Sequence, residues 1–186
     1  MAISVFDPRP TVLTGTHAVL EPLRLAHANE LLVAGGDDAT WMYMARPALR
    51  SIEDAESMIR QALIETEAGR ELAFAIVATA SGKAVGSTRF LDIQRSHRAL
   101  EIGWTWIGAS WQRTAINTEC KLLLLGHAFD TLGANRVTLK TDGFVRDTVY
   151  YGIVALEWPQ VKTRLERMLV ARGAGGQPPD PRTSAP

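Results

Sequence analysis

The residues best suited to chemistry lie in one continuous stretch of the chain, Ala99 to Gly133. Glu101 is a carboxylate within a run of otherwise apolar residues, and burying a charge is costly unless it is paired or faces a cleft. Burial raises the pKa of a carboxyl group toward neutrality, which suits a general base. Glu101 is therefore the main catalytic candidate. The alternative is a structural ion pair with an arginine such as Arg89 or Arg98.

The connector that follows this strand could bind an anion. It runs from Gln112 to Asn117, has short side chains nearby, and leads into an apolar run that stops at Gly133. Asn117 and Thr118 are both good N-cap residues, so we expect the helix to begin there. Because the first N–H groups of a helix lack partners and carry partial positive charge, a strand–connector–helix unit is a ready phosphate site.

Other residue types that often do chemistry are weaker candidates. Cys120 lies in the first turn of the expected helix, where a thiol could be activated, but a small buried residue is the more usual role. The four histidines are too scattered for metal-ligand spacing, so no metal site is expected. Trp104, Trp106 and Trp111 could shape a substrate site, although core packing is the default interpretation.

Hydrophobic alternation and helical periodicity predict the elements that must position these residues. The order is a strand, two helices, three strands joined by hairpins, the central helix, two strands and a last helix. The expected strands are 17–23, 72–79, 84–93, 100–107, 136–142 and 147–154, and the expected helices are 25–33, 51–69, 117–133 and 157–170. Strict alternation in the central strand would put Glu101, Gly103, Thr105 and Ile107 on one face and Leu100, Ile102, Trp104 and Trp106 on the other.

The composition fits one compact domain. The chain has 186 residues, 46% of them hydrophobic, and a formal net charge of zero, so nothing points to nucleic acid or an anionic membrane as a partner. Its single cysteine excludes a disulfide framework and fits a reducing compartment. Without a secretory signal or a bilayer-spanning apolar segment, we expect a soluble cytoplasmic protein. Residues 1–171 should form the domain, and 172–186 a disordered tail.

This element order, with LEIGWTW at 100–106 and WQRTAINTE at 111–119, resembles the GNAT superfamily of acetyl-CoA-dependent N-acetyltransferases. Within it, the two motifs look like the branch of the ribosomal-protein N-terminal acetyltransferases. The likeness covers about residues 11–170. It implies an α+β fold of three layers, in which a mostly antiparallel, twisted sheet is splayed at its central strand and flanked by helices.

The resemblance also implies a reaction and a set of site residues. The reaction is direct transfer of acetyl from acetyl-CoA to a primary amine, either a protein N-terminus or a small molecule, with Glu101 taking a proton from the ammonium group directly or through water. A backbone N–H near Ile107 would stabilise the oxyanion. The strand around Trp106 and Ile107 would pair with the pantetheine arm. The pyrophosphate would lie on the backbone of Gln112, Arg113, Thr114, Ala115, Ile116 and Asn117.

The chain departs from the family pattern in two places, the connector and the link between the fifth strand and the last. The connector differs at two residues. Ala115 stands where the family usually has glycine, and alanine in a left-handed conformation costs roughly 1–2 kcal/mol. Asn117 replaces the final Gly or Ala of the motif, but its capping ability makes this change the lesser one.

The second departure is larger, because family members carry a helix and an edge strand between the fifth strand and the last. Here the chain has room for neither element, and Asp142-Gly143 is a strong signal for a hairpin that joins the two strands directly. In the family that helix often supplies a Tyr or Ser that protonates the CoA thiolate. Tyr150 is a candidate replacement, although core packing is its more usual role.

Because the helix and edge strand of the family are missing, residues 122–125 of the central helix would leave an apolar surface uncovered. We expect another part of the protein, or another copy of it, to pack there. We expect either self-association, including a homodimer, or the last helix folded back, with association favoured. The alternative function is an impaired member that acts as a CoA-binding or protein-association module.

Overall fold

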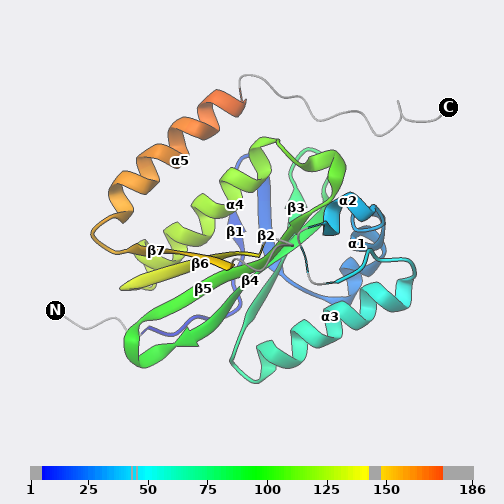
Figure 1. Cartoon of the computed structure of the whole chain (residues 1–186), viewed down its shortest axis with the longest axis horizontal. Helices are drawn as coiled ribbons and strands as arrows, with labels where there is room; N and C mark the ends of the chain where they lie inside the picture. The colour runs from blue at the N-terminus through cyan, green and yellow to red at the C-terminus, as the bar shows by residue number, and fades with distance from the viewer. Residues whose placement is uncertain (1–5, 43, 45, 143–147, 174–186) are drawn as a thin grey trace.

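The computed structural model describes residues 6–42, 44, 46–142 and 148–173, which form a curled seven-stranded sheet with helices on both faces (Figure 1). The strands are β1 (Leu13–Thr14), β2 (Ala18–Pro22), β3 (Leu72–Ala78), β4 (Lys83–Gln94), β5 (Ala99–Ile107), β6 (Arg136–Asp142) and β7 (Thr148–Val154). The helices are α1 (Ala28–Ala34), α2 (Asp38–Trp41), α3 (Ile52–Glu67), α4 (Ala115–Gly126) and α5 (Trp158–Gly173), with a π turn at His127–Thr131. The strand order follows the chain from β1 to β7.

The sheet is splayed at its centre. All neighbouring strands pair antiparallel except β5 and β6, which run parallel. Their pairing begins at Ala99 opposite Arg136 and ends at Ile102 opposite Leu139. Residues 103–107 of β5 therefore have no ladder partner on that side among the described residues, and we call them the open edge. The predicted α+β class and the splayed central strand are confirmed.

A bulge in β5 changes which residues share a face, so the predicted alternation is wrong beyond Gly103. Trp104 adopts a left-handed conformation, with φ of 48°, and the register with β4 slips between Ser87 and Arg89. As a result, Ile107 packs in the same core cluster as Leu100 and Ile102. Trp106 belongs instead to the cluster under α1 and α3.

Two apolar clusters hold the layers together. One lies between the sheet and α4 and is centred on Phe74, Phe90 and Leu124. The other lies on the opposite face, under α1 and α3, where Leu31 and Ile59 are fully buried. Figure 1 shows α4 and α5 on one side of the sheet and α1 to α3 on the other.

The helix ends follow local chemistry, with one correction to the prediction. The expected capping box of α3 is present, because Ser51 and Asp54 each bond the other's backbone N–H. The central helix α4, however, begins at Ala115 with Thr114 as its N-cap, not at Asn117 or Thr118. Thr114 is the N-cap because its backbone is still extended and its hydroxyl accepts a hydrogen bond from the N–H of Ile116.

The helical segment formed by α4 and the π turn after it stops where the sequence predicts it, just before Gly133. Gly133 has φ of 68°, a conformation that glycine adopts without steric cost. The Arg98 side chain donates to the carbonyls of Leu132 and Gly133, which satisfies the end of the helix.

The end of the chain covers α4 from outside. β6 and β7 pair antiparallel from Arg136 opposite Val154 to Asp142 opposite Thr148, as predicted. The Asp142–Gly143 turn itself falls partly outside the described residues. Helix α5 then folds back onto α4, with Trp158 buried against Phe129. Of the two expected ways to cover α4, the structure has the intramolecular one, and α5 includes two residues, 172 and 173, that were expected to be tail.

Candidate functional site

The connector between β5 and α4 is a tight, internally bonded turn. The N–H of Gly108 donates to Val85 O on β4, and the N–H groups of Trp111 and Gln112 donate back into the turn. The side-chain amide of Gln112 donates to Ile107 O at 3.0 Å. The N–H of Gln112 and the carbonyl of Ile107, two groups predicted to meet a cofactor, are thus already engaged within the protein.

The strained residue of the connector is Arg113, not Ala115. Arg113 has φ of 61°, whereas Ala115 is the first residue of α4 and is absent from the left-handed residues of the described chain. The helix starts two residues earlier than predicted, so the glycine-like position falls on Arg113. Left-handed backbone at this residue turns the chain sharply into the helix.

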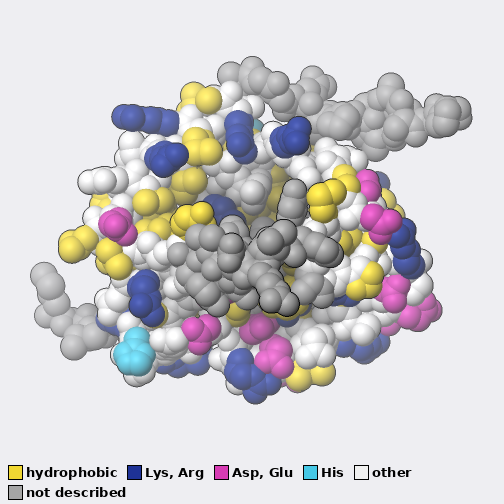
Figure 2. All heavy atoms as spheres, viewed as in Figure 1, with side chains coloured by type: hydrophobic (Ala, Val, Ile, Leu, Met, Phe, Trp, Pro, Cys, Tyr) yellow, Lys and Arg dark blue, Asp and Glu magenta, His cyan; other side chains and the backbone are white. Residues whose placement is uncertain are grey.

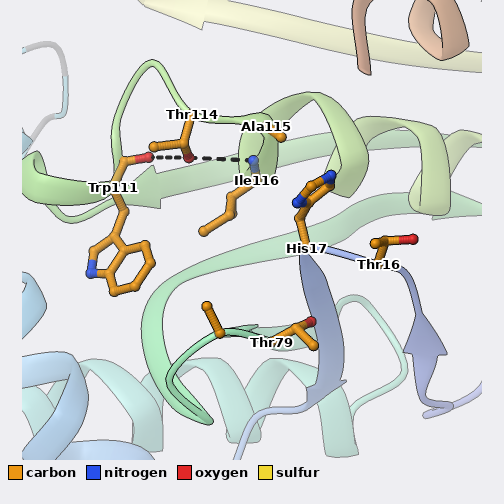
Figure 3. A pocket seen from close by; sticks show the side chains of 8 residues that line it. Thr16, His17, Thr79, Trp111, Thr114, Ala115 and Ile116 are labelled. Atoms are coloured by element: carbon orange, nitrogen blue, oxygen red, sulfur yellow. Dashed lines mark hydrogen bonds between the residues drawn. The ribbon is translucent and has the colours of Figure 1, made fainter. Parts of the chain in front are cut away.

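The start of α4 offers hydrogen-bond donors to an anion. Thr114 Oγ1 donates to Trp111 O at 2.7 Å and accepts from Ile116 N at 3.4 Å, as the dashed lines of Figure 3 mark. The other N–H groups of a first turn have no acceptor within the helix. In addition, an Arg172 guanidinium nitrogen lies 3.4 Å from Thr114 O and 3.1 Å from Thr118 Oγ1. A cation therefore stands beside the helix start, which strengthens the anion site.

A pocket of about 200 Å³ opens beside this helix start, and we call it the connector pocket. Figure 3 shows its two walls, with the His17 ring pointing toward the start of α4. It is lined by Thr16, His17, Thr79, Ala80, Trp111, Thr114, Ala115 and Ile116. Pockets that enclose a drug-sized ligand measure about 300–1,000 Å³, so this one can hold only part of such a ligand.

A buried carboxylate that the sequence analysis gave no role fixes one wall of that pocket. Glu119, in the second turn of α4, accepts hydrogen bonds from the backbone N–H groups of Thr16, His17 and Ala18 at 2.6–2.9 Å. It is 5% exposed. A side chain on Gly15 would collide with this carboxylate. The one available signal was an acid within an otherwise apolar helix.

The open edge of β5 can offer a ligand only main-chain groups at Trp106, because the side chain of this residue is turned to the other face of the sheet. Trp106 points away from α4 and packs on Trp41 in a tilted arrangement, with ring centroids 4.8 Å apart. On its paired side, β5 approaches β4 so closely that a Cβ on Gly86 would overlap Trp106 O. Any use of Trp106 and Ile107 by a ligand is therefore through main-chain groups at the open edge.

Glu101 lies where the splay begins. It stands opposite Leu91 on β4 and Thr138 on β6, one residue before the last paired position. Its Oε1 is 3.2 Å from where a Cβ on Gly103 would lie, so the carboxylate leans along the strand toward the open edge. The two arginines considered as structural partners have other bonds, Arg89 with Glu71 at 2.8 Å and Arg98 with the end of the π turn.

The remaining candidates divide clearly. Cys120 is buried, and desolvation raises the pKa of its thiol to about 12, so it is chemically inert. The Tyr150 side chain lies outside the described residues. Within the described chain no three His, Cys, Asp or Glu side chains are grouped to hold a metal. No described helix is both long and apolar enough to cross a bilayer.

One charged side chain near the open edge was not singled out from the sequence. The Lys121 ammonium of α4 donates to Thr105 Oγ1 at 2.8 Å, and Thr105 shares a 2.8 Å hydrogen bond with Thr88. Its signal in the sequence was a lone charge in the apolar run CKLLLL.

Residues 17–143 match the family model described as acetyltransferase (GNAT) domain. No curated protein matches the chain.

Several solved structures share the fold. A GCN5-related N-acetyltransferase from Brucella melitensis is 22% identical, with a TM-score of 0.82 and 92% of each chain covered. RimJ of Mycobacterium smegmatis, solved with CoA-disulfide, is 20% identical, with a TM-score of 0.71 over 88% of this chain and 95% of that one. The microcin C7 self-immunity acetyltransferase MccE, solved with acetyl-CoA and AMP, is 25% identical, with a TM-score of 0.61 over 68% and 71%.

Proposed function

Because the chain belongs to the GNAT acetyltransferase family, we propose that it transfers an acetyl group from acetyl-CoA to a primary amine by direct attack. The observation that carries the proposal is the splay of β5 from β6 beyond Ile102, with a donor-rich helix start at the far end of the same strand. An extended thioester arm can lie along the open edge while its phosphates meet α4.

The charge of the surroundings supports the phosphate end of this arrangement. Figure 2 shows Lys and Arg side chains along the upper left, where α5 lies in Figure 1. Helix α5 carries Lys162, Arg164, Arg167 and Arg172 against Glu166 alone. Its last arginine bonds to the first turn of α4. The cofactor arm would thus meet main-chain groups of the open edge, and the phosphates would meet the N–H groups of α4 and the arginines of α5.

The acceptor amine would enter beside Glu101. In this proposal Glu101 takes a proton from the incoming ammonium, directly or through water, so that a neutral nitrogen can attack the acetyl carbon. A backbone N–H of the open edge near Ile107 would stabilise the oxyanion. Holding both substrates together supplies much of the remaining rate gain. Acceptors are primary amines, either protein N-termini or small molecules.

A second candidate function is a CoA-binding or protein-association module with impaired catalysis. The short link between β6 and β7 favours it, since Asp142 pairs directly with Thr148 and leaves no room for the helix that other family members carry there. In that case the chain would bind acetyl-CoA without turnover.

The test is a titration followed by an assay. Acetyl-CoA is titrated into the full chain by calorimetry, and free thiol release is then followed with a panel of small amines and of peptides that differ in their first residue. Amine-dependent thiol release supports the acetyltransferase. Binding without release supports the module, and the absence of both excludes the two functions together.

A further inference from the structure

Lys121 is a charged residue of α4 whose side chain reaches the open edge. Its Nζ donates to Thr105 Oγ1 in the middle of that edge. Thr105 in turn bonds to Thr88, which is fully buried on β4. Lys121 and Thr105 both keep part of their surface exposed, so a ligand at the open edge can reach them.

The bulge at Trp104 explains why Lys121 and Glu101 serve opposite sides of β5. Before the bulge, Glu101 lies on the face away from the α4 cluster that buries Leu100 and Ile102. After it, Thr105 faces α4 and meets Lys121. A thioester along the open edge would therefore have a carboxylate on one side and an ammonium on the other. Direct attack can use this arrangement, because one group takes a proton from the amine and a different group gives a proton to sulfur.

The charge of Lys121 is poorly compensated. Among the described residues no carboxylate lies within ion-pair distance of its Nζ, and its recorded partner is a neutral hydroxyl. Of its neighbours on α4, Glu119 is turned to the 16–18 backbone and Cys120 is neutral. The strands facing it supply Thr88 and Thr105. Burial lowers the pKa of Lys121 from 10.5 to about 8.

We propose that Lys121 is the general acid that protonates the departing thiolate of CoA. The inference rests on the proposed acetyltransferase function. As the acceptor nitrogen bonds to the acetyl carbon, the C–S bond breaks and its electron pair stays on sulfur. Lys121 gives one proton to that sulfur, becomes a neutral amine and regains a proton from water. The acceptor ammonium gives one proton to Glu101 before it attacks and a second proton to water as the amide forms. Glu101 then returns its proton to water, so the whole reaction releases one proton.

Two physical arguments favour this role over a purely structural one. A partly buried ammonium held by one hydroxyl costs stability, so an apolar side chain of the same length would serve the fold better. The pKa of about 8 for this amine is also close to the pKa of about 8.5 that is usual for a cysteine thiol, and general acids work best when their pKa is near the working pH. Lys121 of α4 would thus take over the protonation of the thiolate, which a Tyr or Ser of the missing helix often performs in the family.

The experiment compares Lys121→Met with Lys83→Met, which removes an exposed lysine at the first position of β4. Three quantities are measured on the full chain: kcat against pH, the acetyl-CoA dissociation constant, and the titration of the lysine amines by NMR with and without CoA. We expect Lys121→Met to lower kcat by about 10²-fold, the low end for a general acid because a thiolate leaves readily, and to remove the high-pH limb near pH 8. Affinity should change little.

CoA should also shift the NMR titration of Lys121, whereas a CoA analogue that lacks sulfur should not. An unchanged kcat in Lys121→Met, or identical Lys121 titrations with the two ligands, overturns the proposal while leaving the acetyltransferase intact. If the wild-type chain releases no thiol with any amine, the proposed function fails instead, and the role of Lys121 fails with it. Lys83→Met should match the wild type throughout.

Discussion

Oε2 of Glu119 lies 2.6 Å from the backbone nitrogen of His17, more than one hundred residues away in the chain. The same carboxylate also receives the N–H groups of Thr16 and Ala18. One α4 side chain therefore ties the turn between β1 and β2 to the helix whose first turn forms the anion site. Because this carboxylate is buried, its three donors would have no water to replace it.

Glu119→Gln should destabilise the fold by about 2–4 kcal/mol, because a charged acceptor is lost and an amide donor is turned toward backbone donors. Thermal unfolding would report it as a fall in Tm of several degrees. Glu56→Gln, which breaks an exposed pair with Arg60, is the matched control and should change Tm little. A Glu119→Gln chain as stable as the wild type would show that the three bonds contribute nothing net.

Glu101→Gln should reduce the acetylation rate by about 10²–10⁴-fold and leave acetyl-CoA affinity nearly intact, because the amide cannot accept the proton of the incoming ammonium. Steady-state kinetics and calorimetry on the same preparation separate the two effects. If the variant instead loses its cooperative thermal transition, Glu101 is a structural residue and the base must be sought elsewhere.

The left-handed backbone at Arg113 predicts a gain from glycine. Arg113→Gly should stabilise the chain by up to about 1 kcal/mol, since a non-glycine residue there pays roughly 1–2 kcal/mol and glycine adds unfolded-state entropy. Ala115→Gly, in contrast, should be neutral or destabilising, because Ala115 is already helical. Chemical denaturation would measure both. If Ala115→Gly stabilised the chain and Arg113→Gly did not, the strained residue would be Ala115.

Arg172→Ala should weaken acetyl-CoA binding about 3- to 10-fold and make binding less sensitive to salt, because a guanidinium beside the start of α4 is removed. The rate at saturating acetyl-CoA should hold. Arg164→Ala, an exposed arginine of the same helix, is the control. Equal losses in both variants would mean that α5 acts through general charge and not through this contact.

The lowered pKa of Lys121 gives stability a definite pH dependence. Below about pH 8 the amine is charged in both folded and unfolded chains, so the folded state carries the full desolvation cost. Between about pH 8 and 10.5 the folded chain holds fewer protons than the unfolded one, and stability contributed by this group rises with pH. Lys121→Met should therefore exceed the wild type in Tm at pH 7, and the difference should shrink by pH 10. A constant difference would contradict the shifted titration.

Much of the fold can be predicted from sequence because it depends on local patterns. The strands from β3 to β7 end within one or two residues of the expected positions, since alternation and turn residues bound them. The start of α4 was harder, because Thr114, Asn117 and Thr118 are all competent caps and only tertiary packing chooses among them.

The details of the site were less predictable. A left-handed Trp104 has no signature in the sequence, yet that single residue decides which side chains face α4. The contacts of Lys121 with Thr105 and of Glu119 with residues 16–18 join distant segments, and spacing alone does not reveal them. In both cases the available clue was a charge inside an apolar helix.

Helix α5 has a consequence for how the protein is made. The outer face of α4 is complete in the chain long before α5 follows it, and domains fold as the chain emerges from its N-terminal end. Until Trp158 can dock on Phe129, apolar residues of α4 stay in contact with solvent or with chaperones. Chains that end before the last helix would therefore keep an exposed apolar surface on α4, and we expect them to be prone to aggregation.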